Sequence, residues 1–107
     1  MSLSPSPAHI LNTVARSLVA KQKYASIEEA LWELALVAVR SKTVYYRRRI
    51  RRLERKYESD FDTFTAWLKG RATPVEEDDW VAWRSAQGML ADWQQAYRDL
   101  LNERPHG

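Results

Sequence analysis

The sequence predicts an all-α fold, a small helical bundle organised on one long central helix with a projecting basic half. Apolar residues recur at steps of three and four, which is the spacing of an amphipathic helix, and no stretch alternates as a strand does. Helix-start signals precede the periodic stretches. A chain of 107 residues has the length of one domain. We expect a disordered tail over residues 1–6 and a single helical domain over residues 7–104.

The first helix is expected over residues 7–22. Ser6 can cap its start, and Pro7 suits the first helical position, where the missing N–H of proline has no helical partner in any case. One face of this helix is apolar and consists of Leu11, Val14, Ala15 and Leu18.

The central helix is expected over residues 26–57. Ser26 and Glu29 have the spacing of a capping box, in which each side chain binds a backbone N–H at the helix start. The first half of the helix is apolar around most of its circumference, with a thin polar strip of Glu29, Glu33 and Arg40. A helix that is apolar nearly all round is typical of the centre of a core.

The second half of the central helix combines a narrow apolar stripe with many cations. The stripe, which we call the seam, follows heptad spacing and consists of Tyr46, Ile50, Leu53 and Tyr57. Its narrowness favours packing against one partner helix rather than burial in a globular core. Cations surround the helix outside the seam, at Arg47, Arg48, Arg49, Arg51, Arg52, Arg55 and Lys56.

A short third helix is expected over residues 60–69. Ser59 or Asp60 can cap its start, and Gly70 can end it in the left-handed conformation that glycine adopts without strain.

The fourth helix is expected over residues 74–103. Thr73, Pro74 and Glu76 combine a capping threonine, an N1 proline and the glutamate of a capping box. The acidic run 76–79 lies in the first turns, where the helix dipole stabilises negative charge, so it indicates a helix start rather than a cation site. The tryptophans at helical spacing indicate a core or an interface rather than a cofactor site.

Composition argues against several classes of function. The chain has no cysteine, which fits a reducing compartment, and it begins without the features of a signal peptide, so we expect a cytoplasmic protein. The longest apolar run, Leu34–Val39, is far too short to span a bilayer. His9 and His106 have no ligand-spaced partner, and no catalytic or phosphate-binding motif is present. We therefore expect no enzyme activity, no metal, no cofactor and no membrane association.

The arginine cluster allows three interpretations. It can be a solvated helix end that residues 76–79 partly neutralise. It can bind an acidic protein or the acidic turn of a second copy, because the guanidinium fork pairs bidentately with carboxylates. It can also bind nucleic acid weakly, with Tyr45 and Tyr46 as stacking groups. Against nucleic acid, the cations encircle the helix, and no helix-turn-helix or strand platform is recognisable.

Several blocks of the sequence together resemble a known group of proteins. They are Arg48–Tyr57 (RRIRRLERKY), Asp60–Phe64 (DFDTF), Leu68–Lys69 and Glu77–Trp83 (EDDWVAW). They resemble small, mostly uncharacterised helical proteins of archaea and cyanobacteria, in which a basic helix ends in ERKY and an acidic helix start reads EDWxxW. Many of those proteins are encoded beside a small predicted toxin. The resemblance covers about residues 45–100 and implies an antitoxin-like protein that binds rather than catalyses.

The chain departs from that group at Glu58-Ser59, where the relatives tend to carry Gly-Met.

We therefore predict a non-catalytic protein–protein interaction module, the antitoxin-like member of a toxin–antitoxin pair. The partner is either the toxin or a second copy of the chain. The predicted partner-binding residues are Tyr46, Ile50, Leu53, Tyr57, Arg47, Arg48, Arg51, Arg52 and Arg55. The alternative is a nucleic-acid-binding helical protein that uses Arg47, Arg48, Arg49, Arg51, Arg52, Arg55 and Lys56.

Overall fold

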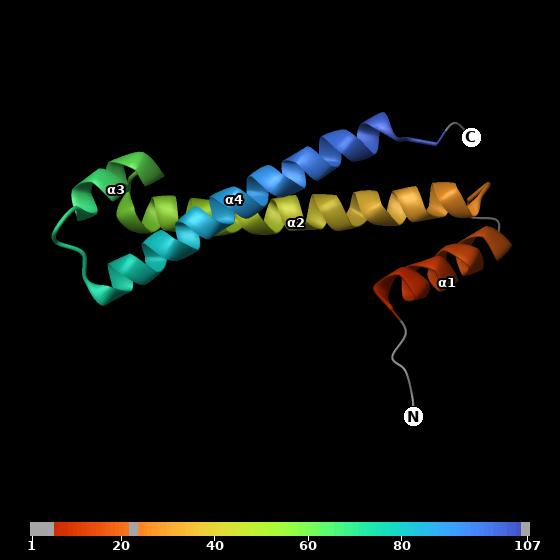
Figure 1. The fold of residues 1–107 in the computed structure, drawn as a ribbon, viewed down its shortest axis with the longest axis horizontal. Coiled ribbons are helices and arrows are strands. Elements are labelled where there is room, and N and C mark those ends of the chain that lie inside the picture. The colour runs from red at the N-terminus through yellow and green to blue at the C-terminus, as the bar shows by residue number, and fades with distance from the viewer. Residues whose placement is uncertain (1–5, 22–23, 106–107) are drawn as a thin grey trace, which may run out of the picture. The chain divides into compact units, whose positions relative to one another are not determined.

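The computed structural model describes residues 6–21 and 24–105, and these residues form an all-α structure (Figure 1). The helices are α1 (Pro7–Ala20), α2 (Ile27–Tyr57), α3 (Phe61–Leu68) and α4 (Pro74–Asn102). Each lies within a few residues of its predicted range, so the predicted fold class is confirmed. The predicted tail lies outside the described residues except for Ser6, and the predicted end of the first helix at Gln22 lies outside them too.

Each helix starts where the sequence places a capping residue. The hydroxyl of Ser6 accepts a hydrogen bond from the His9 N–H at 3.1 Å, and that of Ser26 accepts one from the Glu29 N–H at 3.1 Å. Asp60, rather than Ser59, caps α3 by accepting from the Thr63 N–H at 2.7 Å.

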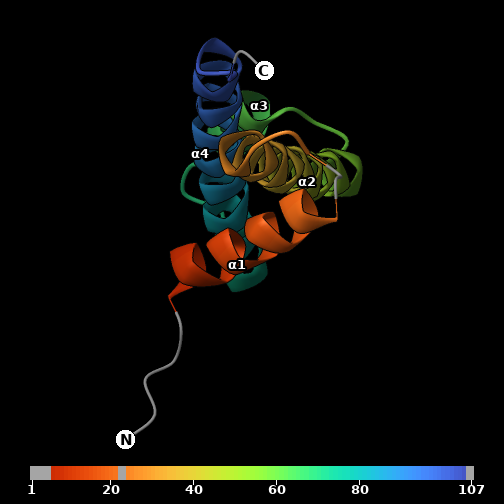
Figure 2. The ribbon, with the colours of Figure 1, turned by 90° about the vertical axis from the view of Figure 1, so that its right-hand side faces the viewer.

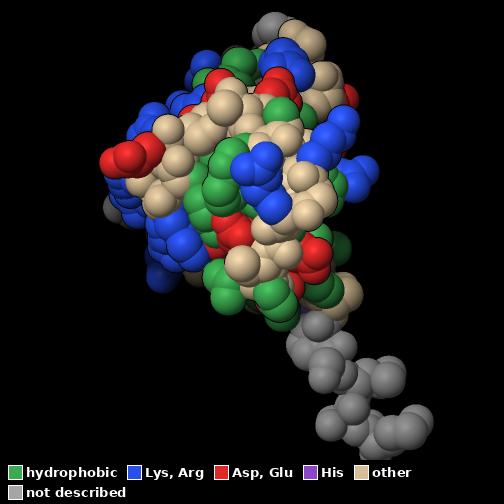
Figure 3. Space-filling model, turned by 90° about the vertical axis from the view of Figure 1, so that its left-hand side faces the viewer, with side chains coloured by type: hydrophobic (Ala, Val, Ile, Leu, Met, Phe, Trp, Pro, Cys, Tyr) green, Lys and Arg blue, Asp and Glu red, His purple; other side chains and the backbone are tan. Residues whose placement is uncertain are grey.

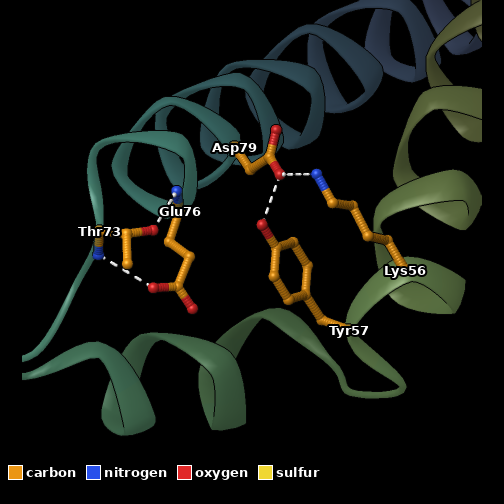
Figure 4. A network of polar contacts seen from close by, with 5 residues as sticks. All are labelled: Lys56, Tyr57, Thr73, Glu76 and Asp79. Atoms are coloured by element: carbon orange, nitrogen blue, oxygen red, sulfur yellow. Dashed lines mark hydrogen bonds and ion pairs between the residues drawn. The ribbon is translucent and has the colours of Figure 1, made fainter.

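The capping box of α4 is reciprocal, because Thr73 and Glu76 each donate a backbone N–H to the side chain of the other, at 2.9 and 3.2 Å (Figure 4). Gly70 has a φ of 72°, so the predicted left-handed glycine after α3 is confirmed.

The residues group into two compact units, Met1–Arg40 with Ala96–Gly107, and Ser41–Gln95. In the first unit α1 lies beside the start of α2 (Figure 2), and Ala15 of α1 and Ala30 of α2 are fully buried. The indole N–H of Trp32 donates to the carbonyl oxygen of Leu100 at 2.8 Å, and the Arg104 guanidinium lies 4.9 Å from the Trp32 ring centre. These contacts join the ends of α2 and α4 that belong to this unit.

The expectation that the first half of α2 is apolar all round and central is only partly right. Ala30, Trp32, Leu36 and Val39 are buried, whereas Val37 is well exposed. Apolar residues therefore extend beyond the face that the unit covers.

The second unit has an aromatic core. Trp83 of α4 is fully buried, and Phe64 and Leu68 of α3 are buried beside it. The ring centres of Phe64 and Trp83 are 5.4 Å apart, and those of Tyr57 and Phe64 are 4.1 Å apart. Aromatic pairs at such distances add to the free energy gained by burial alone. This core fixes the second half of α2 against α3 and the first half of α4.

Candidate functional site

The seam of α2 packs inside the chain. Ile50, Leu53 and Tyr57 are partly buried against the cluster of Phe64, Leu68 and Trp83. These three residues therefore already pack against α3 and α4 within the chain, and their role in binding a partner stays a prediction. Tyr46, the fourth seam residue, is half-buried and meets the ring of Tyr45 edge-on at 4.9 Å.

Five of the six arginines of the cluster, all except Arg49, are exposed. Arg47, Arg48, Arg51, Arg52 and Arg55 are all exposed, and we call them the basic face. At about 100° per residue they span about 140° of the helix circumference, roughly opposite the seam. Figure 3 shows Lys and Arg side chains gathered along the left edge of the view. The seven cations together cover most of the circumference outside the seam, as expected, and these five form one continuous part of it.

The two remaining cations of the cluster have partners within the chain. The Nζ of Lys56 lies 2.6 Å from the Oδ2 of Asp79 in an ion pair. A guanidinium N–H of Arg49 donates to the hydroxyl oxygen of Tyr45 at 3.1 Å, and the guanidinium carbon lies 5.6 Å from the ring centre. Lys56 and Arg49 therefore lie beyond one edge of the basic face, next to Arg52, without belonging to it.

Asp79 is a junction residue that sequence reasoning missed. Its Oδ2 accepts a hydrogen bond from Lys56 and another from the hydroxyl of Tyr57 (Figure 4). The acidic run 76–79 was recognised as a helix start, but nothing in the sequence pairs its last member with residues more than twenty positions earlier. The register of α4 against α2 makes that pairing.

The junction shifts the pKa values of its three groups. Hydrogen bonds from Lys56 and then from Tyr57 lower the pKa of Asp79 below its ordinary value. The hydrogen bond with Asp79 raises the pKa of Lys56. Burial, followed by the hydrogen bond to Asp79, raises the pKa of Tyr57. All three shifts favour the protonation states that hold the junction together at neutral pH.

The acidic turn does not neutralise the basic face. Glu76 serves in the capping box and Asp79 binds Lys56 and Tyr57, while Glu77 and Asp78 are exposed. Within residues 6–21 and 24–105 the structure records no ion pair for any arginine of the basic face. The interpretation of a solvated helix end that residues 76–79 partly neutralise agrees with these contacts, and the neutralisation is at Lys56.

Leaving these arginines unpaired has an energetic cost. Arg47 and Arg51, Arg51 and Arg55, and Arg48 and Arg52 are each four residues apart, where like charges destabilise a helix by roughly 0.2–0.5 kcal/mol per pair. A carboxylate placed over the face would remove this repulsion and could be held by both arms of a guanidinium fork.

Among the described residues no group of His, Asp and Glu side chains could hold a metal ion. None of the described helices is long and apolar enough to cross a membrane. No family model, curated protein or solved structure matches the chain. The resemblance to antitoxin-like helical proteins therefore stays a prediction.

Proposed function

We propose that this chain is a non-catalytic binding protein that takes an acidic protein partner on the basic face of α2. The observation that carries the proposal is that five exposed arginines share one side of a helix without a carboxylate partner. The opposite side of the same helix is packed in the core, so it holds the arginines on a fixed support. Together with the resemblance, this supports an antitoxin-like protein whose partner is a toxin.

A protein partner is favoured over nucleic acid by the apolar residue beside the arginines. Tyr45 does not decide between them, because it is 49% exposed and its ring is also contacted by Arg49 at 5.6 Å and Lys42 at 5.9 Å from its centre. Val44, beside the arginines, is 45% exposed, and an apolar side chain there suits a protein surface better than a phosphate backbone. Nucleic acid is therefore an outcome of the test rather than the proposal.

A homodimer through the seam has less support, because the chain itself covers most of the seam. A dimer through the basic face remains an outcome of the test, in which Glu77 and Asp78 of a second copy would supply the carboxylates.

The test is capture of the partner by the tagged full chain from the lysate of its own source, with nuclease added to half of the sample. We expect one protein in stoichiometric amount in both halves, whose net charge is negative, and a complex of defined mass by light scattering. The variant Arg47→Gln/Arg51→Gln/Arg55→Gln should lose that protein.

The control variant is Arg16→Gln/Lys69→Gln/Arg84→Gln, which removes the same amount of charge at exposed positions outside α2. It should retain the partner. Equal loss from both variants would show that net charge alone drives capture and would contradict the proposal. Nucleic acid in the untreated half, with no protein in the treated half, would replace the proposal with the nucleic-acid alternative. A dimer of the chain alone would replace the toxin with a second copy.

A further inference from the structure

We infer that the element of the partner that binds the basic face is an acidic helix whose carboxylates recur every four residues. This inference rests on the proposed function and names the chemistry of the partner. It follows from how the five arginines are spaced, from what surrounds them and from what their own helix can offer a partner.

The arginines form two parallel rows along α2. One row is Arg47, Arg51 and Arg55, and the other is Arg48 and Arg52. Within each row successive arginines are four residues apart, which is about 6 Å along the helix axis. The longer row therefore extends about 12 Å. A helix lying alongside presents side chains at positions i, i+4 and i+8 with the same spacing, so each carboxylate can meet one guanidinium.

The rows are short. The shorter row is followed four residues later by Lys56, which is bound to Asp79. The longer row is flanked four residues away by the uncharged Thr43 and Ser59. The basic face therefore differs from a long basic tract that any polyanion could occupy.

A helical partner suits α2 better than an extended one. The backbone N–H and C=O groups of α2 are bonded within the helix, so α2 cannot pair with the backbone of a strand. An extended segment lying over arginine side chains would depend on water and on the guanidinium groups for its backbone hydrogen bonds. A helix satisfies its backbone internally and offers only side chains.

One apolar contact accompanies the charges. Val44 is three residues, or about one turn, before Arg47 and lies within the angular range of the basic face. It is 45% exposed. The partner helix should therefore carry an apolar side chain about one turn beyond one end of its acidic run.

Two alanine-based peptides of the same composition test the inference. In the first, glutamates recur every four residues in two adjacent rows, with one leucine a turn away. In the second, the same residues are spread around the helix. Both peptides are blocked at their ends and labelled, their helix content is matched by circular dichroism, and their affinity for the full chain is measured by fluorescence anisotropy.

We expect the first peptide to bind at least tenfold more tightly than the second. The variant Arg47→Gln/Arg51→Gln/Arg55→Gln should abolish this difference, and the control Arg16→Gln/Lys69→Gln/Arg84→Gln should keep it. Val44→Asp should weaken the first peptide at least threefold while leaving the chain folded, because Val44 is exposed.

Equal affinity for the two peptides, or no binding of the first, would overturn the helical partner. The proposed function would still stand if the protein captured from the lysate were lost with the basic-face variant. If a single-stranded oligonucleotide of equal charge bound more tightly than the first peptide and captured protein were absent, the inference and the proposed function would fail together.

Discussion

Two faces of the second half of α2 differ in exposure. Ile50, Leu53 and Tyr57 are covered by α3 and α4 and contribute to the aromatic core. Arg47, Arg51 and Arg55, between and beside them in sequence, remain exposed and have no carboxylate partner in the described part of the chain. The apolar face packs against other helices of the chain, whereas the charged face does not.

The difference separates stability from binding. Burial of the seam stabilises the second unit, because apolar surface is removed from water at roughly 25 cal/mol per Å². The like-charge pairs of the basic face repel one another, and Glu54 and Glu58, three residues after Arg51 and Arg55, offset part of that repulsion. The basic face therefore contributes little to stability, so changes on the two faces should affect different measurements.

The largest loss of stability is expected from a change in the aromatic core. Trp83→Ala should lower the free energy of unfolding by about 3–5 kcal/mol, because it leaves a large cavity in the aromatic core. Trp67 of α3 is 49% exposed, and Trp67→Ala should cost about 1 kcal/mol or less. Urea denaturation followed by circular dichroism measures both. Similar losses for the two variants would contradict the assignment of Trp83 to the core.

A smaller effect is expected at the junction between the two faces. Asp79→Ala removes the acceptor of the half-buried Tyr57 hydroxyl and the ion pair of Lys56, so it should lower the free energy of unfolding by about 1–2 kcal/mol. Asp78→Ala is the matched control, since Asp78 is exposed in the same turn and should change stability by less than about 0.5 kcal/mol.

The contribution of the junction should depend on pH at both extremes. The pKa of Asp79 is lowered in the folded chain, so its stabilisation is present above the unfolded pKa of about 4 and is lost as the pH falls through the folded value. The pKa values of Lys56 and Tyr57 are raised, so their stabilisation is present below about pH 10 and is lost as the pH rises through the folded values. A wild-type advantage over Asp79→Ala that is unchanged at pH 3 would contradict this account.

A glycine at position 58, in the turn that follows α2, should stabilise the chain. Glu58 has a φ of 48°, and the N–H of Ser59 donates to the carbonyl oxygen of Glu54 at 3.2 Å, which is the pattern of a Schellman cap. A residue with a Cβ is strained there, so Glu58→Gly should raise the free energy of unfolding by about 1 kcal/mol. Glu58→Ala keeps the strain and should not produce this gain. An equal gain from both would point to charge rather than conformation.

The smallest effect on stability is expected from changes to the basic face. Arg47→Gln/Arg51→Gln/Arg55→Gln removes two like-charge pairs at four-residue spacing, so it should leave the free energy of unfolding unchanged or raise it by up to about 1 kcal/mol. The gain should shrink at high salt, which screens exposed charges. A clear loss of stability would mean that these arginines have a structural role.

Local signals in the sequence were enough to predict where the helices begin and end. Ser6, Ser26, Thr73 and Gly70 predicted ends that the structure confirms, because caps and left-handed glycines depend on residues within one turn. Glu58 itself has a positive φ, a conformation that only a glycine adopts without strain, and no local signal in the sequence predicted it.

The sequence pattern could not predict which residues far apart in the chain would contact one another. Periodicity shows that Ile50 and Leu53 need an apolar neighbour, but it cannot show whether that neighbour belongs to the same chain. The ion pair of Lys56 with Asp79 could not be predicted either, since the two residues meet only through the packing of α4 on α2. The arginines could be identified as a basic cluster from the sequence, but only the structure shows that Lys56 and Arg49 have partners within the chain while the other five are exposed.

The most direct test measures two quantities for one variant. The affinity for the captured partner and the free energy of unfolding should be determined for the wild type, for Arg47→Gln/Arg51→Gln/Arg55→Gln and for the control Arg16→Gln/Lys69→Gln/Arg84→Gln. The account predicts at least a tenfold loss of affinity for the basic-face variant alone, with no loss of stability. Unchanged affinity in that variant would contradict the central claim that the uncovered face of α2 is the binding surface.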